Sequence, residues 1–163
     1  MVVMGVAGSG KTTVGEALAR AISATYVDGD QLHPEANIAK MSAGIPLVDA
    51  DRWPWLARVG EILKPGTAPV IVGCSALKRA YRDYITERAG APVLFIHLDG
   101  SRDLISHRMR ERTGHFMPTS LLDSQFATLE APGRDENAIR VAIDAPLDQI
   151  VAEITTKLEE RPS

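Results

Sequence analysis

The sequence predicts an α/β fold of three layers, in which helices cover both faces of a five-stranded parallel sheet. Two observations support this prediction. First, short runs that are apolar almost throughout, such as 69–73 (PVIVG) and 92–98 (PVLFIHL), alternate with segments that have the apolar spacing of amphipathic helices. Strands of this kind are typical of a parallel sheet that is buried on both faces. Second, the first apolar run leads directly into a glycine-rich loop and a helical pattern, which is the order of a βα unit.

The expected elements follow one another in strict alternation for most of the chain. Apolar runs predict strands at 1–6, 25–28, 69–73, 92–98 and 139–143. Helical patterns are expected at 11–23, from Pro34 to before Gly44, from Pro54 to before Pro65, and at 77–88, 101–113, 119–129 and 147–160. Proline is favourable in the first turn of a helix. In such folds ligands bind at the carboxyl ends of the strands, which is where functional residues are expected.

Composition limits the function classes. The chain has 163 residues and a net charge of −3, so one domain (1–163) is expected, with neither nucleic acid nor an anionic membrane as a partner. The single cysteine, Cys74, excludes an internal disulfide framework and fits a reducing compartment. No apolar run approaches the length of a membrane span, and no leader pattern opens the sequence, so a cytoplasmic location is expected.

The glycine-rich loop carries the clearest chemical signal. Residues 5–12 (GVAGSGKT) match the phosphate-binding pattern G-x-x-x-x-G-K-[ST] at every fixed position. Backbone N–H groups of such a loop face the β-phosphate of a nucleotide, Lys11 can reach the β- and γ-phosphates, and the Thr12 hydroxyl can ligate Mg²⁺. Together with the alternating elements, this predicts a P-loop kinase architecture. The residues expected to hold ATP are Gly5, Val6, Ala7, Gly8, Ser9, Gly10, Lys11, Thr12 and Thr13.

Two acids follow the second expected strand. One carboxylate of Asp28-Gly29-Asp30 could hold Mg²⁺ through water, and the other could accept a proton from an attacking hydroxyl. The alternative is a polar turn in which an Asp caps the next helix. The neighbouring phosphate loop favours the functional interpretation.

The segment 49–55 (DADRWPW) allows two interpretations. Arg52 could form a fork for a carboxylate substrate. Alternatively, Asp51 caps a helix, the two tryptophans belong to the core, and Arg52 pairs with neighbouring acids; spacing alone slightly favours this second interpretation. Cys74, at the end of the third expected strand, is interpreted as a small buried residue rather than a nucleophile.

A helical lid is expected at about 101–130. Arg108 and Arg112 are four residues apart and share a helix face, and Gly114-His115-Phe116 follows them. Such arginines can stabilise charge on a transferring phosphoryl group while the lid excludes water. The alternative is a solvated basic face that pairs with Glu111 and Asp103.

The motifs together resemble those of the gluconokinases, P-loop kinases related to the shikimate kinases. The resemblance covers essentially the whole chain and is carried by GVAGSGKT, DGDQLHP, SAGIPLVDADRWPWL, CSALKRAYRD, RTGHFMP and SQFATLEAP. It implies transfer of a phosphoryl group from ATP, with Mg²⁺, to the 6-hydroxyl of D-gluconate. It also implies a cytosolic homodimer. The alternative is a kinase of another small sugar acid or a shikimate-like substrate; the triple glycine of shikimate kinases is absent, since Cys74-Ser75-Ala76 stands there.

The resemblance also implies roles for individual residues. Asp28 would hold Mg²⁺ through water with Thr12, and Asp30 would be the base for the 6-hydroxyl. Catalytic roles are expected for Lys11, Asp30, Arg108 and Arg112, with Arg108 also on the nucleotide. Pro146 lies in the segment that matches the adenine loop. Sugar-acid contacts are expected from Asp30, His33, Arg52, Lys78 and Gln125, with Arg52 as the carboxylate clamp.

Overall fold

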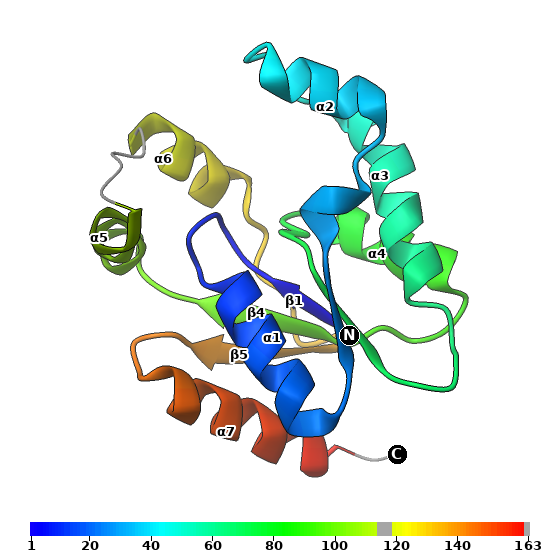
Figure 1. Ribbon diagram of the computed structural model, residues 1–163, viewed down its shortest axis with the longest axis vertical. Coiled ribbons are helices and arrows are strands. Elements are labelled where there is room, and N and C mark those ends of the chain that lie inside the picture. Colours follow the sequence, from blue (N-terminus) through cyan, green and yellow to red (C-terminus); the bar gives the residue numbers. More distant parts are fainter. Residues whose placement is uncertain (114–118, 162–163) are drawn as a thin grey trace.

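The computed structural model describes residues 1–113 and 119–161, and the side chains of residues 112–113 and 119–121 lie outside that description. Five strands form one sheet in the order β2-β3-β1-β4-β5. They are β1 (Val2–Met4), β2 (Thr25–Asp28), β3 (Val70–Gly73), β4 (Phe95–Asp99) and β5 (Ala138–Ala142). Every neighbouring pair is parallel, which confirms the predicted fold class (Figure 1).

Helices cover both faces of this sheet (Figure 1). On one face α1 (Lys11–Ile22) lies against α7 (Leu147–Glu159), and on the other α3 (Asp49–Ile62) lies against α4 (Arg79–Ala89). Successive side chains of a strand point to opposite faces. In β1, Val3 therefore joins the core under α1 and α7, whereas Val2 and Met4 join the core under α3 and α4.

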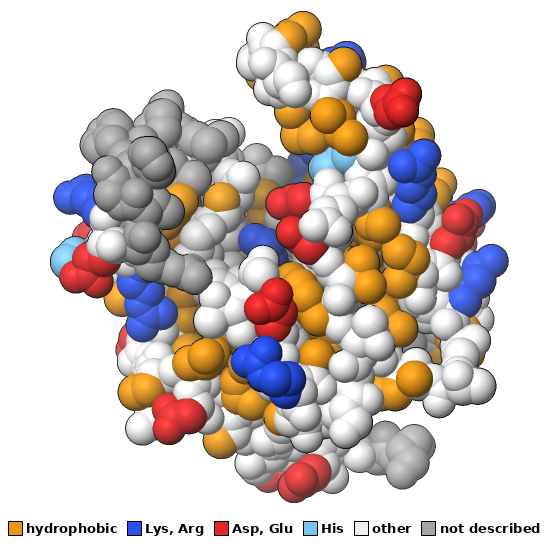
Figure 2. All heavy atoms as spheres, viewed as in Figure 1, with side chains coloured by type: hydrophobic (Ala, Val, Ile, Leu, Met, Phe, Trp, Pro, Cys, Tyr) orange, Lys and Arg blue, Asp and Glu red, His pale blue; other side chains and the backbone are white. Residues whose placement is uncertain are grey.

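Three further helices surround the carboxyl ends of the strands. α2 (Glu35–Ser42) stands away from the sheet, and α5 (Arg102–Thr113) and α6 (Thr119–Thr128) lie on the opposite side of the opening (Figure 1). Figure 2 shows the surface hollowed between these two sides, with side chains of both charge signs at its floor. Within the described residues, no helix combines the length and apolar character needed to cross a membrane.

Most expected elements are confirmed to within three residues at their ends, and one helix start is wrong. α3 begins at Asp49 rather than near Pro54, which lies inside the helix. The Asp51 carboxylate accepts a hydrogen bond from the Val48 N–H (3.0 Å), so it satisfies a free donor at the start of the helix as the capping interpretation predicted. Pro54 lies in the second turn, where it has no N–H to donate to the carbonyl oxygen four residues earlier, so α3 contains one hydrogen bond fewer. The first strand is also shorter than the predicted 1–6.

Candidate active site

The predicted phosphate loop joins β1 to α1. Gly8 and Gly10 have φ angles of +80° and +96°, in the left-handed region that favours glycine. A Cβ on Gly8 would also lie 2.4 Å from the Met109 sulfur of α5. Glycine is therefore strongly favoured at both positions, and the loop leaves the N-terminus of α1 facing the open end of the sheet.

Lys11 folds back over the loop. Its ammonium donates hydrogen bonds to the carbonyl oxygens of Gly5 and Val6, both at 3.0 Å. Burial lowers the pKa of Lys11, and the carboxylates of Asp30 and Asp28 oppose that shift. A phosphate site needs a positive charge that water screens poorly and backbone N–H donors beside it. The Lys11 ammonium in this loop meets both requirements.

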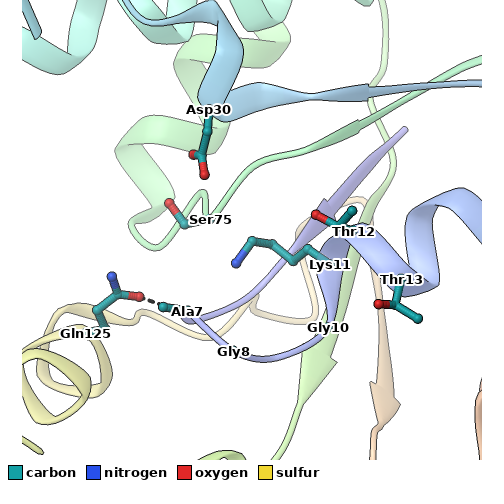
Figure 3. A pocket seen from close by; sticks show the side chains of 9 residues that line it. All are labelled: Ala7, Gly8, Gly10, Lys11, Thr12, Thr13, Asp30, Ser75 and Gln125. Atoms are coloured by element: carbon teal, nitrogen blue, oxygen red, sulfur yellow. Dashed lines mark hydrogen bonds between the residues drawn. The ribbon is translucent and has the colours of Figure 1, made fainter. Parts of the chain in front are cut away.

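A cavity of about 400 Å³ lies over this loop. Its walls come from four parts of the fold, as Figure 3 shows: the loop itself, Asp30 after β2, Ser75 after β3, and Gln125 of α6. The Oε1 atom of Gln125 accepts a hydrogen bond from the Ala7 N–H at 2.7 Å. The residues that line the cavity are Ala7, Gly8, Gly10, Lys11, Thr12, Thr13, Asp30, Ser75 and Gln125. We refer to it as the phosphate cavity.

A second cavity of about 670 Å³ adjoins the first, and we refer to it as the acceptor cavity. Ser75 and Gln125 line both cavities, so the two meet at these side chains. Arg52 is the charged residue among those that line the acceptor cavity, and Trp55, Tyr81 and apolar residues of the α2 side form much of the rest. This wall suits a small anionic molecule whose other end lies next to the phosphate cavity.

Asp49 neutralises the cations around the acceptor cavity. Its carboxylate accepts from Arg52 at 3.2 Å and from the Tyr81 hydroxyl at 2.5 Å, and it lies 3.7 Å from the Lys78 ammonium. The Tyr81 hydrogen bond is the main cause that lowers the pKa of Asp49, and Lys78 and Arg52 add to it. Arg52 is thus paired with an acid, as the structural alternative predicted. It also lines the acceptor cavity, and its role as a carboxylate clamp stays a prediction. Lys78 lies outside the residues that line it.

Asp28 and Asp30 have different roles in the fold. Asp28 Oδ1 accepts from the Asp30 N–H (3.0 Å) and caps the short 3-10 helix η1 (Gly29–Leu32), an element that the sequence analysis missed. The Asp30 carboxylate points into the phosphate cavity toward Ser75 (Figure 3). Both the capping and the functional interpretation of this pair therefore have support, each for one of the two acids.

The donor set near the loop fits Mg²⁺. The Thr12 hydroxyl lines the phosphate cavity, and Asp28, which caps η1 through one carboxylate oxygen, has a second oxygen. Mg²⁺ prefers oxygen ligands and is usually held by one or two protein groups together with substrate phosphates. No group of three or more His, Cys, Asp or Glu side chains in the described part of the chain is arranged around a metal site. A cation here would thus depend on the nucleotide for much of its shell.

His33 lies outside the residues that line either cavity. Its ring stacks on Trp55 (centroids 4.2 Å apart, planes at 18°) and its Nδ1 lies 3.2 Å from Asn37 Nδ2. Burial lowers the pKa of His33, which favours the neutral ring. In this structure His33 supports Trp55, and a direct contact with substrate stays a prediction.

A third cavity of about 250 Å³ lies on the other side of the phosphate loop. Arg108 lines it together with loop residues and with Ile143, Ala145, Leu147 and Ile150. Pro146, the N-cap residue of α7, is not among the lining residues, although its sequence neighbours Ala145 and Leu147 are. An apolar cavity that continues the phosphate site is suited to a nucleotide base. The side chain of Arg112 and the predicted motif at 114–116 lie outside the described part of the chain.

Three residues of the acceptor side were not predicted as site residues. Ser75, Trp55 and Tyr81 line the acceptor cavity. Trp55 also belongs to the buried core, which confirms the structural alternative for the tryptophans. The available signal was position: Ser75 follows a strand end, and Trp55 lies one helical turn from Arg52. Cys74 is buried, as expected, and burial raises its pKa to about 12, which favours the unreactive thiol over the thiolate.

Comparison with known proteins agrees with this geometry. Residues 1–132 match the family model described as an AAA domain. A gluconokinase of Gluconobacter oxydans is 48% identical over 94% of this chain and 88% of its own. The thermosensitive gluconokinase of Escherichia coli is 48% identical over 98% of this chain and 84% of its own. The crystal structure of a gluconokinase from Sinorhizobium meliloti superposes with a TM-score of 0.86 at 49% identity, covering 97% of this chain and 94% of that one. The chain therefore belongs to the gluconokinase family of P-loop kinases.

Proposed function

We propose that this protein transfers the γ-phosphoryl group of ATP to the 6-hydroxyl of D-gluconate, giving 6-phospho-D-gluconate and ADP. One observation carries the proposal: the phosphate cavity and the acceptor cavity meet at Ser75 and Gln125. A nucleotide on the loop would thus direct its terminal phosphate at whatever occupies the second cavity. Family membership identifies that molecule as gluconate.

The chain's own groups can perform the transfer mainly by positioning and charge. Lys11 would leave its two carbonyl partners for the β- and γ-phosphates and neutralise charge on the equatorial oxygens. Asp30 would accept the proton of the attacking hydroxyl, since its carboxylate faces the phosphate cavity. Mg²⁺, held by Thr12 and by Asp28 through water, would supply further charge neutralisation on the phosphates. Arg108, and Arg112 with it, would cover the transferring group from the lid.

Gluconate has a carboxylate at one end and the reacting hydroxyl at the other. Arg52 would hold the carboxylate in the acceptor cavity. Lys78 pairs with the same acid, Asp49, and would contribute a second positive charge near the substrate. Gln125 would contact the sugar acid near the junction, since it lines both cavities. The wild-type ion pair of Arg52 with Asp49 keeps the guanidinium oriented before the substrate binds.

A panel of substrates tests the proposal. ADP release is measured with Mg·ATP and, in turn, D-gluconate, other sugar acids, shikimate and nucleoside monophosphates, and the product is identified with 6-phosphogluconate dehydrogenase. Gluconate should be turned over with the highest kcat/KM. Faster turnover of any other member would refute the substrate assignment.

Two variants test the residue roles. Asp30→Asn should lower kcat by about 10²-fold or more while the affinity for Mg·ADP changes little. Arg52→Ala should raise the KM for gluconate by at least about tenfold, because a charged hydrogen bond to the carboxylate is lost. Arg58→Ala is the matched control, since Arg58 is an exposed arginine of the same helix that donates to the Leu32 carbonyl. An equal loss for ATP in Arg52→Ala would indicate misfolding instead.

The assembly and location belong to the same proposal. The family resemblance supports a cytoplasmic homodimer. Light scattering of the purified chain should give the mass of two chains, and a monomer at micromolar concentration would contradict this part.

A further inference from the structure

Arg82 of α4 is a buried charge that the proposed mechanism does not use. Its side chain is 1% exposed, and its partner Glu136 is 8% exposed. Neither residue lines the phosphate or the acceptor cavity. A charge is rarely buried this far unless its hydrogen bonds are satisfied, and here they hold together parts of the chain that are distant in sequence.

The guanidinium of Arg82 makes four hydrogen bonds. Two go to the Glu136 carboxylate, from Nε at 2.7 Å and from Nη2 at 3.1 Å. Nη1 donates to the Ala76 carbonyl oxygen and Nη2 to the Glu130 carbonyl oxygen, both at 2.8 Å. Arg82 therefore connects the loop after β3 with the segment between α6 and β5. Lysine could not make this pattern, because only the planar fork of arginine reaches all of these acceptors at once.

The first connection determines the place of Ser75. Ala76 has a φ angle of +45°, an unfavourable left-handed conformation for a residue with a Cβ. The Arg82 bond to the Ala76 carbonyl holds the loop in that conformation. Ser75, immediately before it, accepts a hydrogen bond from the Gly5 N–H (3.3 Å) through its carbonyl oxygen and lines both cavities.

The second connection determines the place of Gln125. The Glu130 N–H donates to the Leu77 carbonyl (2.7 Å), and the Leu129 N–H donates to the Gln125 carbonyl (2.9 Å). The end of α6 is thus held against the loop after β3, the same loop to which Arg82 donates a hydrogen bond. Ser75 and Gln125 are the residues common to the two cavities, and Arg82 binds the chain one residue after Ser75 and five residues after Gln125.

We propose that Arg82 is a positioning residue for phosphoryl transfer: by joining the loop after β3 to the segment after α6, it holds Ser75 and Gln125 at the spacing that aligns the acceptor with the γ-phosphate. This inference rests on the proposed kinase activity. It predicts that loosening Arg82 impairs alignment of the two substrates more than binding of the nucleotide alone.

Arg82→Lys tests the proposal, with Arg79→Lys as its matched control. Arg79 lies on the same helix and also bridges to the segment between α6 and β5, through Asp135 at 2.7 Å, but this pair is exposed. Both variants are assayed well below their melting temperatures. Arg82→Lys should lower kcat/KM for gluconate about 10- to 100-fold, because small displacements of reacting groups cost that much. Its Kd for Mg·ADP should stay within about twofold of wild type, and Arg79→Lys should match wild type in both measurements.

A rescue experiment separates positioning from general destabilisation. Ala76→Gly removes the steric cost of the left-handed conformation that the Arg82 bond sustains, because glycine adopts this conformation readily. In the Arg82→Lys background, Ala76→Gly should recover at least about threefold of the lost kcat/KM, whereas in the wild-type background it should change little. Should Arg82→Lys not fold, Glu136→Gln weakens the same contact more mildly, and it should show the same loss for gluconate without loss for Mg·ADP.

Any of three results would overturn the inference. Folded Arg82→Lys could show the same gluconate kinetics as Arg79→Lys, or it could lose Mg·ADP affinity by as large a factor as it loses kcat/KM. The third result is that Ala76→Gly recovers none of the lost kcat/KM in the Arg82→Lys background. Failure of the proposed function would look different, since the wild-type chain itself would then not turn over gluconate.

Discussion

Trp55→Phe is expected to weaken the fold and the site together. The indole Nε1–H donates to the Gly29 carbonyl at 2.8 Å in a buried place, and the ring stacks on His33. Phenylalanine keeps an aromatic ring there but cannot donate this hydrogen bond. Gly29 immediately precedes Asp30, so the bond connects the acceptor cavity wall to the proposed base.

The magnitude follows from the group that is left behind. A buried carbonyl without a partner costs about 1–3 kcal/mol, and the smaller ring also leaves unfilled space beside His33. A total of about 2–3 kcal/mol is therefore expected. For a chain of this length each kcal/mol lowers the melting temperature by about 2–4 °C, so Trp55→Phe should melt about 4–12 °C below wild type.

Trp53→Phe is the matched control in a calorimetric and urea-unfolding comparison. Trp53 packs edge-on against Tyr81 and Tyr84, contacts that a phenylalanine ring can retain. Trp53→Phe should therefore be less destabilised than Trp55→Phe, and only Trp55→Phe should also lose kcat. Equal melting temperatures for the two variants would refute the reasoning, because the hydrogen bond to Gly29 would then contribute nothing.

Three further outcomes are expected. Gly73→Ala should lower the free energy of unfolding by about 1–3 kcal/mol, because its new Cβ would lie 2.1 Å from the Tyr26 hydroxyl oxygen. Gly66→Ala is the control, since its Cβ would lie 4.0 Å from the nearest atom, and it should stay within about 0.5 kcal/mol of wild type in urea unfolding. Burial lowers the pKa of His33 below its ordinary value of 6.5, so the unfolded chain binds more protons below about pH 6.5. The free energy of unfolding should therefore fall as the pH decreases below about 6.5, with a shallower slope in His33→Gln; identical slopes would contradict this. Because burial raises the pKa of Cys74 to about 12, iodoacetamide should label the folded chain far more slowly than the unfolded chain, as mass spectrometry can measure.

The fold could be predicted from the sequence because its signals are local. The central strands are apolar almost throughout, and the phosphate loop needs glycines and Lys11 at fixed spacing. These features predict the position of the phosphate loop between β1 and α1, where the structure has it. Asp30 lines the phosphate cavity, and the order of elements predicts that place because Asp30 follows a parallel strand next to the loop; its role as a base stays a prediction.

The acceptor side depends on contacts between distant residues and was predicted less well. Arg52 lines the acceptor cavity as expected, but its partner Asp49 also binds Tyr81, which lies on another helix. His33 looked like a candidate for substrate contact, and its stacking on Trp55 is visible only once α3 is folded beside η1. Contacts between residues this far apart leave no short-range pattern in the sequence from which they could be predicted.

The burial of Arg82 also depends on contacts between residues that are distant in sequence. In sequence it is one basic residue among several in CSALKRAYRD, and Glu136 lies 54 positions away. Its burial follows from packing of the segment after α6 on α4, which no local periodicity encodes. A charge pattern alone would have placed it on the solvated face of the helix.

The most direct test of the account is ³¹P NMR of a mixture of the purified wild-type chain, Mg·ATP and D-gluconate, beside the same mixture with Lys11→Ala. The wild-type spectrum should gain one phosphomonoester signal of 6-phospho-D-gluconate for each ADP formed, and Lys11→Ala should be slower by about 10³-fold or more. Release of inorganic phosphate without that ester, or equal rates for the two proteins, would contradict the claim that the phosphate loop aims ATP at gluconate in the adjoining cavity.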